Sequence, residues 1–274
     1  MILPDRLDHA TALALLQWQV ELGADEALGD APVNRYATPP REPAPAAPVA
    51  AAPATAPAAP ARAPLAAAPA PAVDPVAEAT RRAAASATLV DLAEAMRDFD
   101  LCDLKLGARS MVFADGRPGA RVMVIGEAPG AEEDREGRPF VGRAGRLLDR
   151  MFAAIGLDRS APGTERALYI TNVLPWRPPL NRAPTAEEIA MFRPFLARHV
   201  ELAAPELVVL MGNSPCAAVL GRTGILGLRG QWTQALDRPV MPMTHPSYLL
   251  RKPDAKRAAW ADLLEIQARL RTPR

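Results

Sequence analysis

A short apolar run that ends in a glycine-rich loop constrains the fold more than any other feature of the sequence. Residues 122–125 (VMVI) lead directly into GEAPG, residues 126–130. Such a run is typical of a buried parallel strand, and the glycines after it let the backbone approach a ligand closely. A second β-type run, residues 239–243, ends just before His245. Polar residues at two distant strand ends predict the ligand-binding edge of an open α/β sheet.

Apolar runs alternate with helical patterns along most of the chain. The predicted strands are residues 121–126, 168–174, 206–212 and 239–244. The predicted helices are residues 75–98, 143–155, 185–203, 214–221 and 253–270. Thr185 and Glu188 have the spacing of a capping box, which marks a helix start. The alternation predicts a three-layer α/β/α sandwich around a central, mostly parallel four-stranded sheet.

The first part of the chain contains a long stretch of alanine and proline. Residues 38–76 are almost uncharged, and this composition cannot bury enough apolar surface to form a core. We therefore predict a helical segment at residues 1–30, a disordered linker at 31–76 and a globular domain at 77–274. Helical periodicity over residues 9–29 indicates a tethered element that binds a protein partner; a helix without a partner is the alternative.

Composition excludes several classes of protein. The net charge of +1 gives no overall basic field for nucleic acid, so any basic surface must be local. The two cysteines form neither a CxxC motif nor a disulfide framework. The N-terminus lacks the features of a signal peptide, and no apolar run is long enough for a membrane span. We therefore expect a soluble, cytoplasmic, monomeric protein.

Five sequence motifs appear in a fixed order between about residues 99 and 270. They are GEAPG, the pair Glu133-Asp134, GRPFVGRAGRLLD, TNVLPWRPPLNRAPTAEE and HPSYLLR. With these motifs in this order, the chain resembles the family 4 uracil-DNA glycosylases. The resemblance implies an α/β/α sandwich, in agreement with the strand and helix pattern. It also implies hydrolysis of the bond between uracil N1 and deoxyribose C1′ in DNA, which leaves an abasic site and starts base-excision repair. A uracil within a duplex must first leave the base stack.

The resemblance implies that uracil is bound by Gly126, Glu127, Phe140, Asn172 and His245. Phe140 would stack on the base, and the amide of Asn172 would match uracil N3–H and O4 together. Cytosine presents the reverse pattern and would be rejected, because buried polar groups would stay unpaired. His245 would donate to uracil O2 as the anion develops. The ordinary alternatives are a core phenylalanine, an asparagine that caps a turn and a structural histidine.

The predicted catalytic residues are His245, Glu127 and Asn172. Family 1 enzymes carry an aspartate where Ala128 stands here, so we do not expect a simple aspartate-activated water. Glu127 would stabilise the cationic sugar, orient the water or shape the base pocket, and these alternatives stay open. Glu133 follows in the same loop. For this residue, an ordinary solvated charge is at least as good an interpretation as a role in the site.

The predicted DNA contacts are Gly130, Arg143, Ser247, Tyr248, Leu249 and Arg251. In the family, the loop that corresponds to HPSYLLR enters the DNA, and Leu249 is the candidate wedge between base steps. Residues 245–274 contain seven Lys or Arg and three Asp or Glu, a local net charge of +4. Phosphate contacts are therefore expected near this end of the chain.

The chain departs from the family at the metal site. Family 4 enzymes usually hold a [4Fe–4S] cluster on four cysteines, whose positions match Phe99, Cys102, Trp176 and Phe192. Only Cys102 is a cysteine, and apolar side chains cannot replace thiolate ligands. We therefore predict no cofactor and a hydrophobic filling of the cluster volume. Cys216 is expected to be an ordinary buried residue.

Two other classes of function compete with a glycosylase. A non-catalytic DNA-binding or recruitment protein would keep the fold and use the N-terminal helix for partners. A small-nucleotide hydrolase would need a Walker lysine or a carboxylate metal cluster, and neither is present. A related branch that traps DNA covalently carries a Lys/Arg-rich insertion after the asparagine strand, whereas RPPLNRAP is short here. The sequence thus favours a monofunctional uracil-DNA glycosylase that turns over by hydrolysis.

Overall fold

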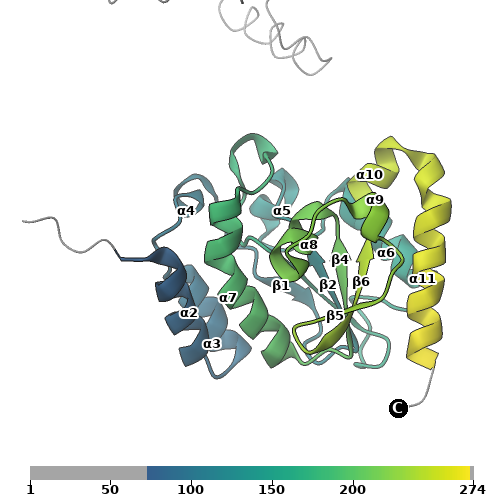
Figure 1. The fold of residues 1–274 in the computed structure, drawn as a ribbon, viewed down its shortest axis with the longest axis horizontal. Coiled ribbons are helices and arrows are strands. Elements are labelled where there is room, and N and C mark those ends of the chain that lie inside the picture. The colour runs from purple at the N-terminus through teal and green to yellow at the C-terminus, as the bar shows by residue number, and fades with distance from the viewer. Residues whose placement is uncertain (1–72, 272–274) are drawn as a thin grey trace, which may run out of the picture. The chain divides into compact units, whose positions relative to one another are not determined.

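The computed structural model describes residues 73–271 (Figure 1). The predicted segment 1–30 and the linker up to residue 72 lie outside these residues. Helix α2 (Pro75–Ala85) is the first described element, and its N-cap Asp74 accepts from the backbone N–H of Val76. It begins just before the predicted domain start at residue 77.

A single six-stranded sheet forms the centre of the domain. Its strands are β1 (Ala114–Gly116), β2 (Val122–Gly126), β3 (Leu168–Asn172), β4 (Leu207–Met211), β5 (Thr233–Ala235) and β6 (Arg238–Met243). Their order is β1-β3-β2-β4-β6-β5. The four inner strands are parallel, as predicted, and β1 and β5 add antiparallel edges that the sequence did not predict. Each edge strand has three residues and lacks a continuous apolar run.

Helices cover both faces of the sheet. One face carries α2, α3 (Leu89–Arg97), α7 (Ala186–Ala203) and α8 (Asn213–Leu220), and the other carries α6 (Arg143–Ala153), α10 (Pro246–Arg251) and α11 (Lys256–Arg271) (Figure 1). Alternate residues of β2 point to opposite faces, so that Met123 and Ile125 pack in one core while Val122 and Val124 pack in the other. The three-layer sandwich is therefore confirmed.

Short helices connect these layers. They are α4 (Leu104–Gly107), α5 (Ala131–Glu136), η2 (Pro179–Asn181), α9 (Ile225–Leu228) and η3 (Pro253–Ala255). None of the described helices is both long and apolar enough to cross a membrane.

The predicted helix boundaries are correct where a capping signal was used and wrong where one was overlooked. Helix α7 starts after Thr185, whose hydroxyl accepts from the backbone N–H of Glu188, and the Glu188 carboxylate accepts from the N–H of Thr185. The single helix predicted at 75–98 is two helices, because Thr88 and Asp91 form a second capping box that starts α3.

The strand order places a crevice at one edge of the sheet. From β2 the chain continues to β3 on one side and later to β4 on the other side. The connections therefore diverge at the carboxyl end of β2, which is the usual position of a ligand site in an open α/β sheet.

Candidate functional site

A cavity of about 660 Å³ opens at the carboxyl ends of the parallel strands. Its walls include Glu127 after β2, Asn172 at the end of β3, Gly212 after β4 and His245 after β6. The predicted residue Phe140 lines it as well. A cavity of this size suits a small organic ligand. The structure thus brings together side chains that are far apart in the sequence.

Glycine at position 126 lets two of these side chains meet over the end of β2. A Cβ on Gly126 would lie 2.5 Å from a ring carbon of Phe140 and 2.4 Å from Oδ1 of Asn172. Any larger residue would displace the ring and the amide. Gly145 is needed for the same reason, since a Cβ there would lie 1.8 Å from the carbonyl oxygen of Phe140. Gly126 is therefore a packing requirement of the pocket.

The side chain of Asn172 is buried but available to a ligand. Only 6% of the residue is exposed, and within residues 73–271 its amide makes no hydrogen bond to the protein. A buried amide without a partner is costly, and one that faces a cavity can offer two donors and one acceptor to a ligand.

His245 is held in one orientation by the start of α10. The backbone N–H of Ser247 donates to His245 Nδ1 at 3.1 Å, and the Ser247 hydroxyl lies 2.8 Å from the same nitrogen. Because Nδ1 accepts from an N–H, the neutral ring carries its proton on Nε2. Burial, helped by the positive charge of Arg251, lowers the pKa of His245 to about 4. The pocket therefore contains a neutral histidine whose Nε2–H is a donor.

The rings of Phe140 and His245 stack beside each other in the lining of the pocket. Their centroids are 5.5 Å apart and the ring planes differ by 29°. Phe140 is 6% exposed and belongs to the core on the α6 side of the sheet. It is thus both a core residue and an aromatic surface of the pocket.

Glu127 has a partner that the sequence analysis missed. The hydroxyl of Ser214, at the start of α8, donates to Glu127 Oε2 at 2.6 Å. Within residues 73–271, Oε1 makes no hydrogen bond to the protein. The Gly-Asn-Ser sequence after the strand predicted at 206–212 has the same strand-end pattern as GEAPG and was a usable signal.

Glu133 is a structural carboxylate, so the alternative of a solvated loop charge is wrong. It accepts from the backbone N–H of Gly130 at 3.1 Å and from those of Val141 and Gly142 at 2.9 Å. These bonds tie the start of α5 to the loop that carries Phe140. Helix α5 itself was not predicted.

The segment HPSYLLR is a short helix, α10, and this corrects one predicted DNA contact. Leu249 is 1% exposed and packs in the core on the α6 and α11 side. A helical turn after Pro246 directs this residue inward, so the prediction that Leu249 is a wedge in DNA is wrong. Ser247, Tyr248 and Arg251 do line the cavity.

The remaining predicted DNA contacts differ in position. Gly130 lines the cavity, whereas Arg143 is an exposed residue at the first turn of α6 outside the cavity wall. Thr244 lines the cavity and was not predicted. Its hydroxyl is buried without a hydrogen-bond partner among the described residues.

The four positions that match cluster cysteines lie in one buried core. Phe99, Cys102, Trp176 and Phe192 are each at most 5% exposed. The rings of Phe99 and Phe192 meet edge to face, with centroids 5.8 Å apart. We call Phe99, Trp176 and Phe192 the aromatic plug. Among residues 73–271, no group of three or more His, Cys, Asp or Glu is placed to hold a metal ion. Cys216 is fully buried in α8, as predicted.

Comparison with known proteins places this chain in a family. Residues 113–264 match the family model of the uracil DNA glycosylase superfamily. The chain is 37% identical over 163 residues to the type-4 uracil-DNA glycosylase of Thermotoga maritima. The matched region covers 58% of this chain and 82% of the relative. It is 33% identical over 190 residues to the type-4 enzyme of Archaeoglobus fulgidus, which covers 65% of this chain and 92% of the relative. The chain belongs to the uracil-DNA glycosylase superfamily, in its family 4 branch.

Proposed function

We propose that this protein is a uracil-DNA glycosylase that hydrolyses the N-glycosidic bond of uracil in DNA and leaves an abasic site. The observation that carries the proposal is the convergence of Phe140, Asn172 and His245 on one cavity at the carboxyl ends of the sheet. An aromatic face, a free amide and a neutral N–H donor are what recognition of a flat base and stabilisation of its anion require.

Recognition of uracil depends on Phe140 and Asn172. The base leaves the stack and lies against the Phe140 ring, which replaces part of the lost stacking. The Asn172 amide accepts from N3–H and donates to O4. With cytosine, the N4 amino group and unprotonated N3 would face the wrong partners, and the buried amide of Asn172 would stay unsatisfied. Selection against cytosine is therefore expected to be strong.

His245 and Glu127 act on the two charges that develop as the bond breaks. The electrons of the C1′–N1 bond move to uracil, and His245 Nε2–H donates to O2 of the anion. The sugar becomes cationic and is attacked at C1′ by water, which loses a proton to solvent. Glu127, held by Ser214, presents its free Oε1 to this water or to the cation.

DNA would approach from the open side of the cavity. Ser247, Tyr248 and Arg251 line the cavity, and so does Gly130. Arg143 stands at the exposed start of α6, where the N-terminal helix dipole also favours a phosphate. We propose these residues as contacts to the phosphates and sugars beside the flipped nucleotide.

We further propose that the protein works without an iron–sulfur cluster. Three of the four ligand positions carry Phe99, Trp176 and Phe192, whose side chains offer no thiolate. The rings of Phe99 and Phe192 meet edge to face, and all three aromatic side chains are buried. None of the residues assigned to the pocket is at these positions, so the chemistry does not need the cluster. The cysteine that remains, Cys102, is buried beside them in the same core.

The test is a uracil-excision assay with the purified full-length protein. A labelled oligonucleotide with one uracil is incubated with the protein and treated with alkali, which cuts at abasic sites. The same oligonucleotide with cytosine is the specificity control. We expect cutting only at uracil, and strong loss of cutting with Asn172→Ala. Tight binding of uracil DNA without an abasic product would instead indicate a non-catalytic recruitment protein.

Three expectations stay predictions. They are a monomeric state, a cytoplasmic location and a protein partner for residues 1–30. Size-exclusion chromatography with light scattering tests the first of them directly.

A further inference from the structure

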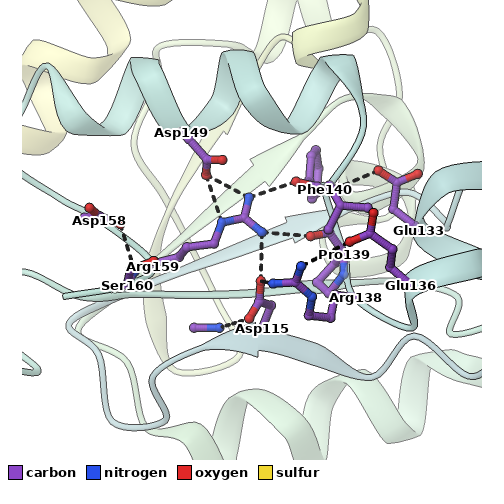
Figure 2. Close-up of polar contacts among 12 residues, drawn as sticks. Asp115, Glu133, Glu136, Arg138, Pro139, Phe140, Asp149, Asp158, Arg159 and Ser160 are labelled. Carbon is purple, nitrogen blue, oxygen red and sulfur yellow. Dashed lines mark hydrogen bonds and ion pairs between the residues drawn. The ribbon is translucent and has the colours of Figure 1, made fainter. Parts of the chain in front are cut away.

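The loop that carries Phe140 is held by one largely buried arginine side chain. Arg159, in the connection between α6 and β3, has a side chain that is 11% exposed. Its Nη2 donates to the carbonyl oxygen of Phe140 at 3.0 Å, and its Nη1 donates to the carbonyl oxygen of Pro139 at 2.9 Å (Figure 2). One guanidinium thus holds two successive carbonyl groups beneath the aromatic face of the pocket.

Two carboxylates accept further hydrogen bonds from the guanidinium and hold it in place. Asp149 on α6 accepts from Arg159 Nε at 2.8 Å, and Asp115 on the edge strand β1 accepts from Nη1 at 3.0 Å (Figure 2). Arginine is suited to this position because its planar group carries several donors in fixed directions, whereas lysine is a single point charge. The unpredicted strand β1 therefore has a role, since it brings Asp115 to this place.

The peptide bond after Phe140 is held at both of its ends. Arg159 donates to its carbonyl oxygen, and its N–H, on Val141, donates to Glu133 Oε1 at 2.9 Å. Phe140 has a φ of 53°, a left-handed backbone conformation that phenylalanine rarely adopts. Such a conformation persists only when the surroundings enforce it. Arg159 and Glu133 together supply that enforcement.

We propose that Arg159 is a positioning residue, which sets the place of the Phe140 ring in the uracil pocket through the main chain and without touching the base. This inference rests on the proposed role of Phe140 as the stacking platform. Loss of the guanidinium would free the Pro139 and Phe140 carbonyls, and the ring would leave the position that a flat base needs. Arg159 would then be required for uracil binding although it does not line the cavity.

The test compares Arg159→Met with and without Phe140→Ala. The affinity for free uracil and kcat/KM on uracil DNA are measured for wild type, both single variants and the double variant, at a temperature where all are folded. In the protein that keeps Phe140, Arg159→Met is expected to weaken uracil binding and kcat/KM by about 10- to 100-fold. In the Phe140→Ala background the same change is expected to cost at most about twofold, because there is no ring left to position. Arg159→Lys should lie between wild type and Arg159→Met.

Arg121 provides a matched control. It makes a two-bond pair with Glu206 and donates to the carbonyl oxygen of Leu270, at the amino end of β2 away from the cavity. Arg121→Met should lower the melting temperature and leave the affinity for uracil unchanged. If Arg159→Met does not fold, Asp149→Asn replaces it, since the Asp149 side chain is 45% exposed and its change only loosens the guanidinium. A weaker uracil affinity is still expected.

The outcomes separate this inference from the proposed function. Equal losses from Arg159→Met in the two backgrounds would overturn the positioning role and leave the glycosylase intact. Full uracil affinity and activity in Phe140→Ala would remove the stacking platform, and the positioning role with it. An inactive wild type that still binds uracil would defeat the proposed reaction, while the affinity comparison would still decide the role of Arg159.

Discussion

The uracil pocket and the aromatic plug belong to one domain but follow different rules. In the pocket, the direction of each polar group matters: Asn172 has a free amide, and His245 has a defined tautomer. In the plug, Phe99 and Phe192 pack edge to face in an apolar core, and the Arg82 guanidinium lies 6.0 Å from the centroid of the Phe99 ring. On the proposed function, the reaction would depend on the identity of the pocket residues, whereas the plug would depend on how well its volume is filled.

The largest expected effect is on the plug. Phe192 is fully buried and packs against Phe99 and Phe195. Phe192→Ala should lower the free energy of unfolding by about 3–5 kcal/mol, because it leaves a cavity. Urea unfolding measures this, and excision per folded molecule should remain unchanged below the unfolding transition. A loss of excision in the folded variant would show that the plug also affects the reaction, and would contradict the separation of the two regions.

The next effect compares a histidine of the pocket with a histidine of the core. His245 lines the pocket, whereas His199 lies in the core, with its Nε2 2.9 Å from the hydroxyl of Tyr169. His245→Ala should lower kcat about 100- to 1000-fold, as expected for a lost donor to a developing anion. His199→Gln, which keeps a hydrogen-bonding group, should retain most of kcat. Single-turnover excision kinetics check both variants, and similar losses in the two would contradict the assignment.

Acid should affect stability before it affects the reaction. Burial lowers the pKa of His199 to about 3, and burial with the charge of Arg251 lowers that of His245 to about 4, from an ordinary value of 6.5. Below about pH 6.5 the unfolded chain takes up protons that the folded one refuses, so stability falls by about 1.4 kcal/mol per pH unit for each histidine.

Urea unfolding between pH 6.5 and 5 measures this loss, and His199→Gln should reduce the slope by the share of one histidine. Over the same range kcat/KM should be nearly constant, because His245 stays neutral in the folded protein. A fall of kcat/KM with a midpoint near pH 6.5 would show that the pocket histidine must lose a proton to act.

The smallest effect concerns the support of Glu127. Ser214→Ala removes one hydrogen bond to a carboxylate that the proposal assigns to water or to the sugar cation. We expect a loss in kcat of about fivefold, or about 1 kcal/mol. Glu127→Gln serves as the comparison, and it should cost more than Ser214→Ala. Pre-steady-state excision at saturating enzyme measures both variants. An unchanged kcat for Ser214→Ala would show that Glu127 does not depend on the hydrogen bond from Ser214.

Much of the parallel sheet could be predicted from the sequence, for a physical reason. Buried parallel strands are continuous apolar runs, and the ends of such runs carry Gly126, Asn172 and His245. Because parallel strands end at the same edge, these residues had to meet. The short edge strands gave no such signal, since three residues such as Ala-Asp-Gly can lie in a turn as easily as in a strand.

Two local features explain the errors. The family resemblance implies a loop at residues 245–251, but proline is favoured in the first turn of a helix, and this turn buries Leu249. The role of Arg159 could not be predicted either. Its partners Asp115, Asp149 and Phe140 lie on a strand, a helix and a loop, and only the folded chain brings them together.

We propose that the pocket excises uracil and that the aromatic plug occupies the volume of the cluster. Measurements on a single preparation of the protein test both statements. Purified wild-type protein is assayed for uracil excision, for iron content and for visible absorbance, before and after treatment with a strong iron chelator. We predict excision of uracil at an unchanged rate, with no stoichiometric iron and no cluster absorbance. Iron bound at about four per chain, with excision lost when it is removed, would contradict the account.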